Sequence, residues 1–236
     1  MKKIITLLMM PLMLGALAAC SDDTDRLLEE ELPDTRTPEM SDSPYYWNNG
    51  QRHQLKYVDN KSFLLFYEKD KDAVLTQLEE QGVDTESLRY YTYTLPPEQF
   101  SDQGEGIEYF QHCLSAEINA NYQTISTIPE IIYTCPFLCL PETGETFPLT
   151  NIVYVYGGGV GNIKKIAEEC NALLIGCYKA VANMYFVGCT KNSIGNALEV
   201  ANIFAESGLF QDAEPNMPAI KPAVVPNYLI HPEDYQ

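Results

Sequence analysis

The feature of this sequence that most restricts its fold is the order of the elements predicted for residues 151–216. Strand, helix, strand, strand, helix and strand follow one another, separated by turns that contain Gly or Asn. The strands are predicted at 151–156, 173–181, 185–190 and 210–214, and the helices at 162–170 and 193–207. A βαββαβ order buries its apolar surfaces when both helices cover one face of a four-stranded antiparallel sheet. We therefore predict a ferredoxin-like domain in residues 150–217.

Both helices of this region are predicted from the spacing of their apolar residues, which recur at i, i+3, i+4 and i+7. These residues are Ile163, Ile166, Ala167 and Cys170 in the first helix and Ala197, Val200, Ala201 and Phe204 in the second. Gly208 predicts the end of the second helix, and Leu209 is expected to make the apolar contact that accompanies such a stop.

Residues 44–149 are predicted to form a β-rich α+β lobe that precedes the βαββαβ unit. Asn48-Asn49-Gly50 predicts a hairpin within Tyr45–Leu55, because the turn positions tolerate positive φ. Further strands are predicted at 62–67, 89–95, 122–127 and 131–140, and one helix at 71–81 between Asp70 as its cap and Gly82 as its stop. Residues 100–121 fit neither period well. The whole fold is therefore predicted to be α+β.

The first 19 residues have the pattern of a bacterial lipoprotein signal peptide. A positive start precedes the apolar stretch Ile4–Ala16, which is too short for a membrane-spanning helix. Leu17-Ala18-Ala19-Cys20 matches the lipobox, so cleavage is expected between Ala19 and Cys20, with lipid attached to the Cys20 thiol. Each buried CH₂ of an acyl chain contributes about 0.8 kcal/mol to membrane attachment. The alternative is an ordinary secretory signal with a chance cysteine.

Residues 20–43 are predicted to be an acidic, disordered tether, because they are rich in Asp, Glu, Pro, Ser and Thr. The run Ser21-Asp22-Asp23 directly after Cys20 resembles the surface-export signal of Bacteroidetes lipoproteins. It predicts an outer-membrane lipoprotein exposed on the cell surface. A tether without any export role is the alternative, which leaves the choice between the periplasmic and the outer face open.

The chain is strongly acidic, with a formal net charge of −18 that becomes −20 when the signal peptide is removed. Such a charge repels nucleic acid, so no nucleic-acid partner is expected. Apart from the lipid anchor, no later segment is long and apolar enough to predict a membrane span.

No residue pattern predicts a catalytic, metal or cofactor site. Gly157–Gly161 lies between a strand and a helix but lacks the Lys-Ser/Thr of a P-loop and the later acid of a dinucleotide site, so a turn is predicted. His53, His112 and His231 are far apart, and no Gly-x-Ser-x-Gly motif is present. We therefore expect no enzyme activity and no cofactor.

Six cysteines follow Cys20, and none forms a Cys-x-x-Cys pair, so the spacing argues against zinc. Cys177 and Cys189 are equidistant from Asn183, and a hairpin with a three-residue loop would place them opposite each other. Two interpretations stay open. They form a cross-strand disulfide, which an oxidising envelope permits, or they are two small thiols in the core.

Four short segments between Tyr185 and Asn216 carry a resemblance to a known family. They are Thr190-Lys191, Gly195-Asn196-Ala197-Leu198-Glu199, Glu206-Ser207-Gly208-Leu209-Phe210 and Ala213-Glu214-Pro215-Asn216. Together they resemble the N-terminal pro-region of Bacteroidetes subtilisin-like serine proteases. Tyr45–Leu55, Ser62–Tyr67 and Pro136–Asn151 resemble its earlier part more weakly, so the resemblance spans most of residues 44–217.

The resemblance implies a pro-unit that assists folding of a catalytic domain, packs its sheet on the enzyme and lays its C-terminal tail in the substrate cleft. Residues 218–236 would be this extended, Pro-rich tail, with Asp234, Tyr235 and Gln236 nearest the cleft. No catalytic domain is recognised after residue 217, so no nucleophile, base or oxyanion donor is carried over.

Three functions are consistent with these observations. The first is an inhibitor or folding chaperone of a subtilisin-like protease supplied in trans. The second is the remnant of a truncated subtilase gene, folded but without activity. The third is a peptide- or glycan-binding surface lipoprotein, with a site near Tyr90, Tyr91 and Tyr93.

Overall fold

The structure is a computed structural model in which residues 43–48, 50–93, 95–217 and 231–232 are described. The predicted signal peptide, the tether up to residue 42 and most of the predicted tail lie outside these residues. In the described part of the chain, no helix has the length and apolar character needed to cross a membrane.

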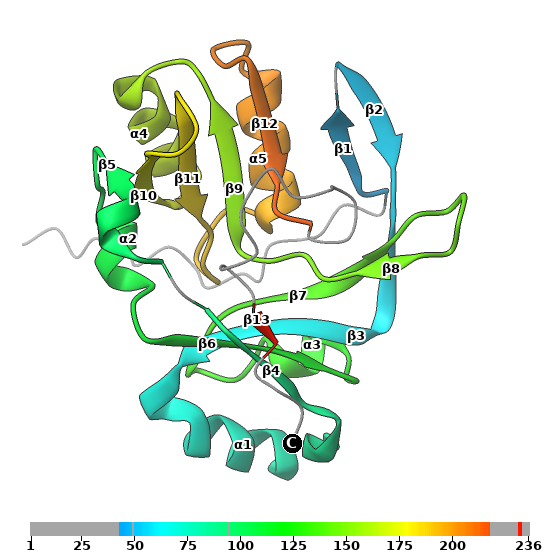
Figure 1. Cartoon of the computed structure of the whole chain (residues 1–236). Coiled ribbons are helices and arrows are strands. Elements are labelled where there is room, and N and C mark those ends of the chain that lie inside the picture. The colour runs from blue at the N-terminus through cyan, green and yellow to red at the C-terminus, as the bar shows by residue number, and fades with distance from the viewer. Residues whose placement is uncertain (1–42, 49, 94, 218–230, 233–236) are drawn as a thin grey trace, which may run out of the picture. The chain divides into compact units, whose positions relative to one another are not determined.

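Residues 152–215 form the predicted βαββαβ unit, which we call the second module. Its elements are β9 (Ile152–Tyr156), α4 (Val160–Glu169), β10 (Leu173–Tyr178), β11 (Met184–Gly188), α5 (Ala197–Glu206) and β12 (Asp212–Pro215). The strands pair in the order β12-β9-β11-β10, antiparallel throughout. Figure 1 shows α4 and α5 on the same side of this sheet. The ferredoxin-like prediction is confirmed, and the whole fold is α+β.

The preceding lobe contains the same topology once more, which we call the first module. Its elements are β3 (Lys56–Tyr67), α1 (Lys71–Glu80), β4 (Arg89–Thr92), β6 (Cys113–Ile118), α3 (Tyr122–Ile125) and β7 (Ile131–Cys139). The strands pair in the order β7-β3-β6-β4, again antiparallel. The fourth, first, third and second strands are therefore neighbours in both modules. The chain contains two ferredoxin-like modules in tandem.

The strand predicted at 122–127 is wrong, and this error concealed the first module in the sequence. Tyr122–Ile125 is the one-turn helix α3, and the side chain of Asn121 accepts a hydrogen bond from Gln123 N. The Asn121 cap satisfies a backbone donor at the helix start, and this outweighs the strand preference of the β-branched residues that follow. The strand Cys113–Ile118 was not predicted at all.

The first module is joined to the second through the long connection between β4 and β6. This connection carries β5 (Phe100–Ser101) and α2 (Gly106–Tyr109), and β5 pairs with the edge of β10. A loop of the first module thus adds a fifth strand to the sheet of the second. Gly176 permits the close approach, because a Cβ there would lie 2.9 Å from the carbonyl oxygen of Ser101.

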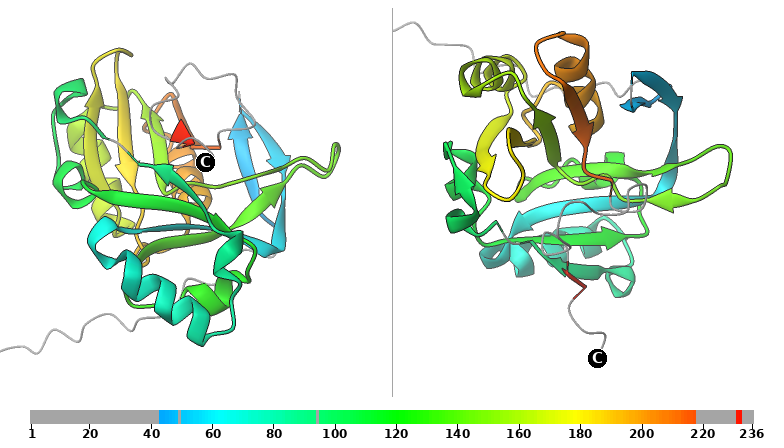
Figure 2. Two further views of the ribbon diagram at one scale, coloured as in Figure 1. Left: turned by 60° about the horizontal axis from the view of Figure 1, so that its bottom comes forward. Right: turned by 45° about the horizontal axis from the view of Figure 1, so that its top comes forward.

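The sheet of the first module is buried on both faces. Leu64, Phe66 and Ile118 pack with residues of α1 and α3, which lie on one side of the sheet in Figure 2. On the other face, Phe63 and Tyr133 belong to a larger core that includes residues of the second module. Side chains alternate between the two faces of each strand, so one sheet supplies both cores.

Additional strands extend the two sheets. β8 (Thr146–Phe147) pairs with β7, and β13 (His231–Pro232) pairs with β4. The predicted hairpin is confirmed as β1 (Tyr45–Asn48) and β2 (Gln51–Gln54). It is held on the second module because Tyr45 Oη and Trp47 Nε1 both donate to Glu206 Oε1, at 2.7 and 3.1 Å.

The N-terminus of α5 is where the two modules exchange polar contacts. Asn196 Oδ1 accepts hydrogen bonds from Leu198 N and Glu199 N, and Glu199 Oε2 accepts from Asn196 N, which completes a capping box. The remaining N–H, that of Ala197, donates to Tyr133 Oη of β7 at 3.2 Å. Asn196 Nδ2 donates to Tyr57 Oη of β3 at 2.9 Å. Every donor in the first turn is therefore paired, one of them by the first module.

Two details of the predicted helix ends are wrong. α5 begins at Ala197 and not at 193, because the capping box lies at Asn196. Gly208 has a positive φ of 70°, as expected for the stop, and Leu209 beyond it is 46% exposed. At α1, Gly82 is the stop with φ of 74°, whereas the Asp70 side chain makes no capping bond.

Replacing Asn196 by alanine should reduce the free energy of unfolding by about 1–2 kcal/mol, because the cap and the bond to Tyr57 are lost together. Urea denaturation of the lipid-free protein measures this change. Asn162→Ala is the matched control, since that side chain bonds only Gly158 O on the exposed side of α4. Equal effects of the two substitutions would contradict the role assigned to the α5 terminus.

Candidate functional site

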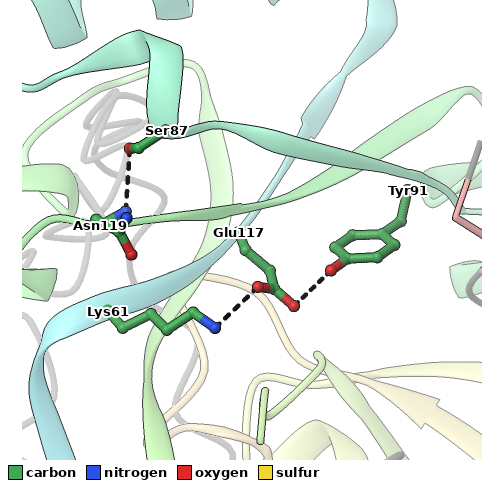
Figure 3. A network of polar contacts seen from close by, with 5 residues as sticks. All are labelled: Lys61, Ser87, Tyr91, Glu117 and Asn119. Atoms are coloured by element: carbon green, nitrogen blue, oxygen red, sulfur yellow. Dashed lines mark hydrogen bonds and ion pairs between the residues drawn. The ribbon is translucent and has the colours of Figure 1, made fainter. Parts of the chain in front are cut away.

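A polar network lies on three neighbouring strands of the first module. Glu117 of β6 forms an ion pair with Lys61 of β3, with 3.0 Å between Lys61 Nζ and Glu117 Oε2. Tyr91 of β4 donates its phenolic hydrogen bond to Glu117 Oε1. Figure 3 shows the carboxylate of Glu117 between the Lys61 and Tyr91 side chains. Glu117 is only 12% exposed, so the ion pair and the phenol compensate the cost of burying its charge.

The network borders a polar hollow of about 190 Å³. Its wall includes Lys61, Glu86, Ser87, Arg89, Glu117, Ile118 and Asn119. Asn119 N donates to Ser87 Oγ at 3.3 Å and thereby joins β6 to the turn before β4, as Figure 3 shows. The Lys61 ammonium also lies 4.1 Å from the centre of the Phe137 ring, a cation–π contact that fixes its position.

These residues can bind charged or hydrogen-bonding groups. Glu117 already accepts from Lys61 and Tyr91, and the wall contains no histidine or cysteine. Within the described residues, no group of three or more His, Cys, Asp or Glu side chains could hold a metal ion. The arrangement is suited to recognition of a ligand.

β4 is also the strand to which β13 is added. His231 is opposite Thr92, and Pro232 is opposite Tyr91, in antiparallel register. Arg89 is the first residue of β4 and its side chain is exposed. It lies opposite Glu117 of β6. The backbone edge of β4 and the hollow are thus adjacent.

The residues predicted for lipid attachment and for the protease cleft cannot be placed. Ala19 and Cys20 lie outside the described residues, as do Asp234, Tyr235 and Gln236. The lipid anchor and the binding role of the tail stay predictions.

Of the two interpretations left open for Cys177 and Cys189, two free thiols is the one that the structure has. All six described cysteines are free, and Cys177 lies opposite Tyr185. The loop between Tyr178 and Met184 is longer than three residues, so the pairing is not symmetric about Asn183. Cys189 is instead fully buried, and Cys177 is half-buried.

The Gly-rich segment is a turn, as predicted. Gly157, Gly158 and Gly159 have φ of 80°, 75° and 76°, and they connect β9 to α4. A Cβ at Gly158 would lie 2.3 Å from the Phe210 ring, so packing also requires glycine there. β10 pairs with β11 in antiparallel orientation and not with β9, which is unlike a dinucleotide-binding unit.

The aromatic site suggested for Tyr90, Tyr91 and Tyr93 does not form. Strand alternation places Tyr90 against the α1 side, where the Lys71 ammonium lies 4.5 Å from its ring centre. Tyr91 is bonded to Glu117, and Tyr93 is buried against Phe110. The three rings therefore share no surface for a glycan.

Sequence reasoning missed Lys61 and Glu117. The only available signal was the single acid in the apolar run Cys113–Ile118, and that strand was not recognised. Lys61 precedes the predicted strand 62–67, whereas β3 begins at Lys56. Their contact depends on the pairing of β3 with β6, which no local pattern indicates.

Comparisons with known proteins add little. No protein-family model matches the chain, and no curated protein matches it. Among solved structures, the small subunit of acetolactate synthase from Thermotoga maritima is similar over 68% of this chain and 94% of its own. The identity is 10% and the TM-score 0.23, so this likeness carries no functional argument.

Cysteine reactivity should follow burial. Burial raises the pKa of Cys113 to about 12 and that of Cys170 to about 11, where Glu169 adds to the shift. At pH 8 we expect iodoacetamide to modify only the half-buried Cys139 and Cys177 in folded, lipid-free protein with Cys20→Ser, and all six remaining cysteines in urea. Mass spectrometry counts the adducts, and rapid modification of Cys189 in the folded protein would contradict the assignment.

The same shifts predict an alkaline loss of stability. The folded state holds these thiols protonated, so their stabilising contribution is present below the ordinary thiol pKa of 9.0 and is lost as pH rises toward about 12. As far as these thiols determine it, the urea concentration at the midpoint of unfolding should therefore be constant below pH 9 and fall above pH 9. A Cys113→Ala, Cys170→Ala variant should show a shallower fall than the parent.

Replacing Glu117 by glutamine should lower the free energy of unfolding by about 1 kcal/mol, because Lys61 loses its partner and Tyr91 its charged acceptor. Urea denaturation at low and high salt measures the effect. Lys165→Met is the control, because its ion pair with Glu169 spans 3.9 Å on an exposed helix face. A change as small as that of the control would contradict the proposed strength of the network.

Proposed function

We propose that this chain is a non-catalytic, lipid-anchored protein of the bacterial outer membrane that binds a subtilisin-like protease supplied in trans. It would act as an inhibitor or a folding chaperone of that enzyme. The observation that carries the proposal is the second module. Its ferredoxin-like strand order coincides with the segment, Tyr185–Asn216, whose sequence resembles a subtilase pro-region.

The position at which the second module ends supports the proposal. β12 ends at Pro215, and Asn216 N donates to Ile152 O at 2.8 Å while Asn216 O accepts from Thr150 N. The fold is therefore anchored up to Asn216. The Pro-rich residues that follow Met217 in the sequence would be the segment laid in a substrate cleft.

The chemistry of the chain also supports a binding role. The family region that the sequence resembles is a pro-unit, which acts by binding a protease. The polar hollow of the first module is lined by charged side chains that can bind a ligand. Extended segments can be added to sheets of this chain, since β13 pairs with β4. Strand addition of the same kind is how a tail would bind along a protease cleft.

The test uses the lipid-free mature chain, with Cys20→Ser, and a subtilisin-like protease encoded by the same organism. We expect the chain to slow cleavage of a peptide substrate, and deletion of residues 234–236 to weaken inhibition at least tenfold. These residues follow both modules in the sequence, and we expect their deletion to leave the free energy of unfolding in urea within about 0.5 kcal/mol of the parent's. Absence of inhibition and of any effect on refolding, for every subtilase of the organism, would reject the proposal.

A further inference from the structure

The two modules use the same edge of their sheets in the same way. The second strand of each module, β4 or β10, is the last of the four strands on its side. An added segment of two residues pairs antiparallel with each: Phe100–Ser101 with β10, and His231–Pro232 with β4. An unpaired strand edge exposes backbone donors and acceptors, so both modules cover the equivalent edge.

The two added segments differ in how they are held. β5 is flanked by backbone hydrogen bonds from Lys179 N to Gln99 O and from Gly104 N to Ile175 O, at 2.9 and 3.1 Å. Phe100 is 2% exposed and contacts the rings of Phe186 and Tyr178. β5 is therefore fixed in the core. β13 is two residues long, pairs with Thr92 and Tyr91, and follows both modules in the sequence.

Charge favours an acidic strand on this edge. Arg89 is exposed at the start of β4, and within the described residues it forms no ion pair. The register pairs Pro232 with Tyr91, so the next two positions along an added strand correspond to Tyr90 and Arg89. In the sequence, Glu233 and Asp234 follow Pro232. An acid opposite Arg89 would form a favourable cross-strand pair.

We infer that the β4 edge is an acceptor site for an acidic extended strand, and that its occupant in the unbound protein is the chain's own C-terminal segment, residues 231–236. The inference rests on the proposed function in one respect: the residues that β4 holds are those assigned to the protease cleft. A short pairing is weak by itself, but the covalent connection gives the segment a high effective concentration at β4. A protease cleft that binds more of the segment then displaces it.

Disulfide trapping tests the docking in the full lipid-free chain, in a Cys20→Ser, Cys139→Ser, Cys177→Ser background. The in-register pair is Thr92→Cys with His231→Cys. The control pair is Thr76→Cys with His231→Cys, because Thr76 is exposed on α1 and only random collisions of the tail would reach it. We expect the in-register pair to cross-link at least tenfold faster, within single chains on a non-reducing gel.

The charge contribution has its own control. Arg89→Glu should slow the in-register cross-link at least threefold, whereas Arg89→Lys should leave it nearly unchanged. Equal rates for the in-register and control pairs, cross-links between chains instead of within them, or no difference between the two Arg89 variants would overturn the inference. The cross-link needs no protease. A normal cross-link without inhibition would therefore reject the protease partner alone, and inhibition without the cross-link would reject the β4 site alone.

Discussion

The start of α5 is the interaction on which the arrangement of the two modules most depends. A helix N-terminus brings unpaired N–H groups, and burying it is costly unless each finds an acceptor. Here Asn196 serves two donors, and the hydroxyl of Tyr133, from the first module, serves Ala197. Burial raises the pKa of the Tyr133 phenol well above its ordinary value, so it stays a neutral hydroxyl at this junction. Neither module alone provides the complete set of partners.

In the remaining contacts, too, each module supplies groups that the other needs. The first module gives β5 to the second sheet, and the second module covers the face of the first sheet that α1 and α3 leave open. The β1–β2 hairpin bonds to Glu206 near the end of α5. Because both faces of the first sheet are used for packing, only its rim and its edge are left accessible within the described residues. The Glu117 network and the β4 edge lie there, side by side.

The second module could be predicted because its helices are ten residues long and show a clear apolar period. The first module has the same strand order, but α3 is one turn long, and a connection of twenty residues separates β4 from β6. Such local signals are too weak to show a repeated topology. The partner of Cys177 was missed for a related reason: the loop between β10 and β11 is longer than three residues, so Cys177 faces Tyr185, and the sequence does not mark the loop length.

By itself, the sequence determined the elements that depend on near neighbours: the amphipathic helices, the turns at Gly50, Gly82 and Gly208, the βαββαβ order of residues 151–216 and the acidic charge. It could do so because these features follow from backbone preference and from periodicity over a few residues. Only the tertiary structure decided that the lobe is a second module, that Lys61 meets Glu117, and that β13 lies on β4. These contacts join residues far apart in the chain, and strand pairing sets them by satisfying backbone hydrogen bonds and burying two faces of one sheet.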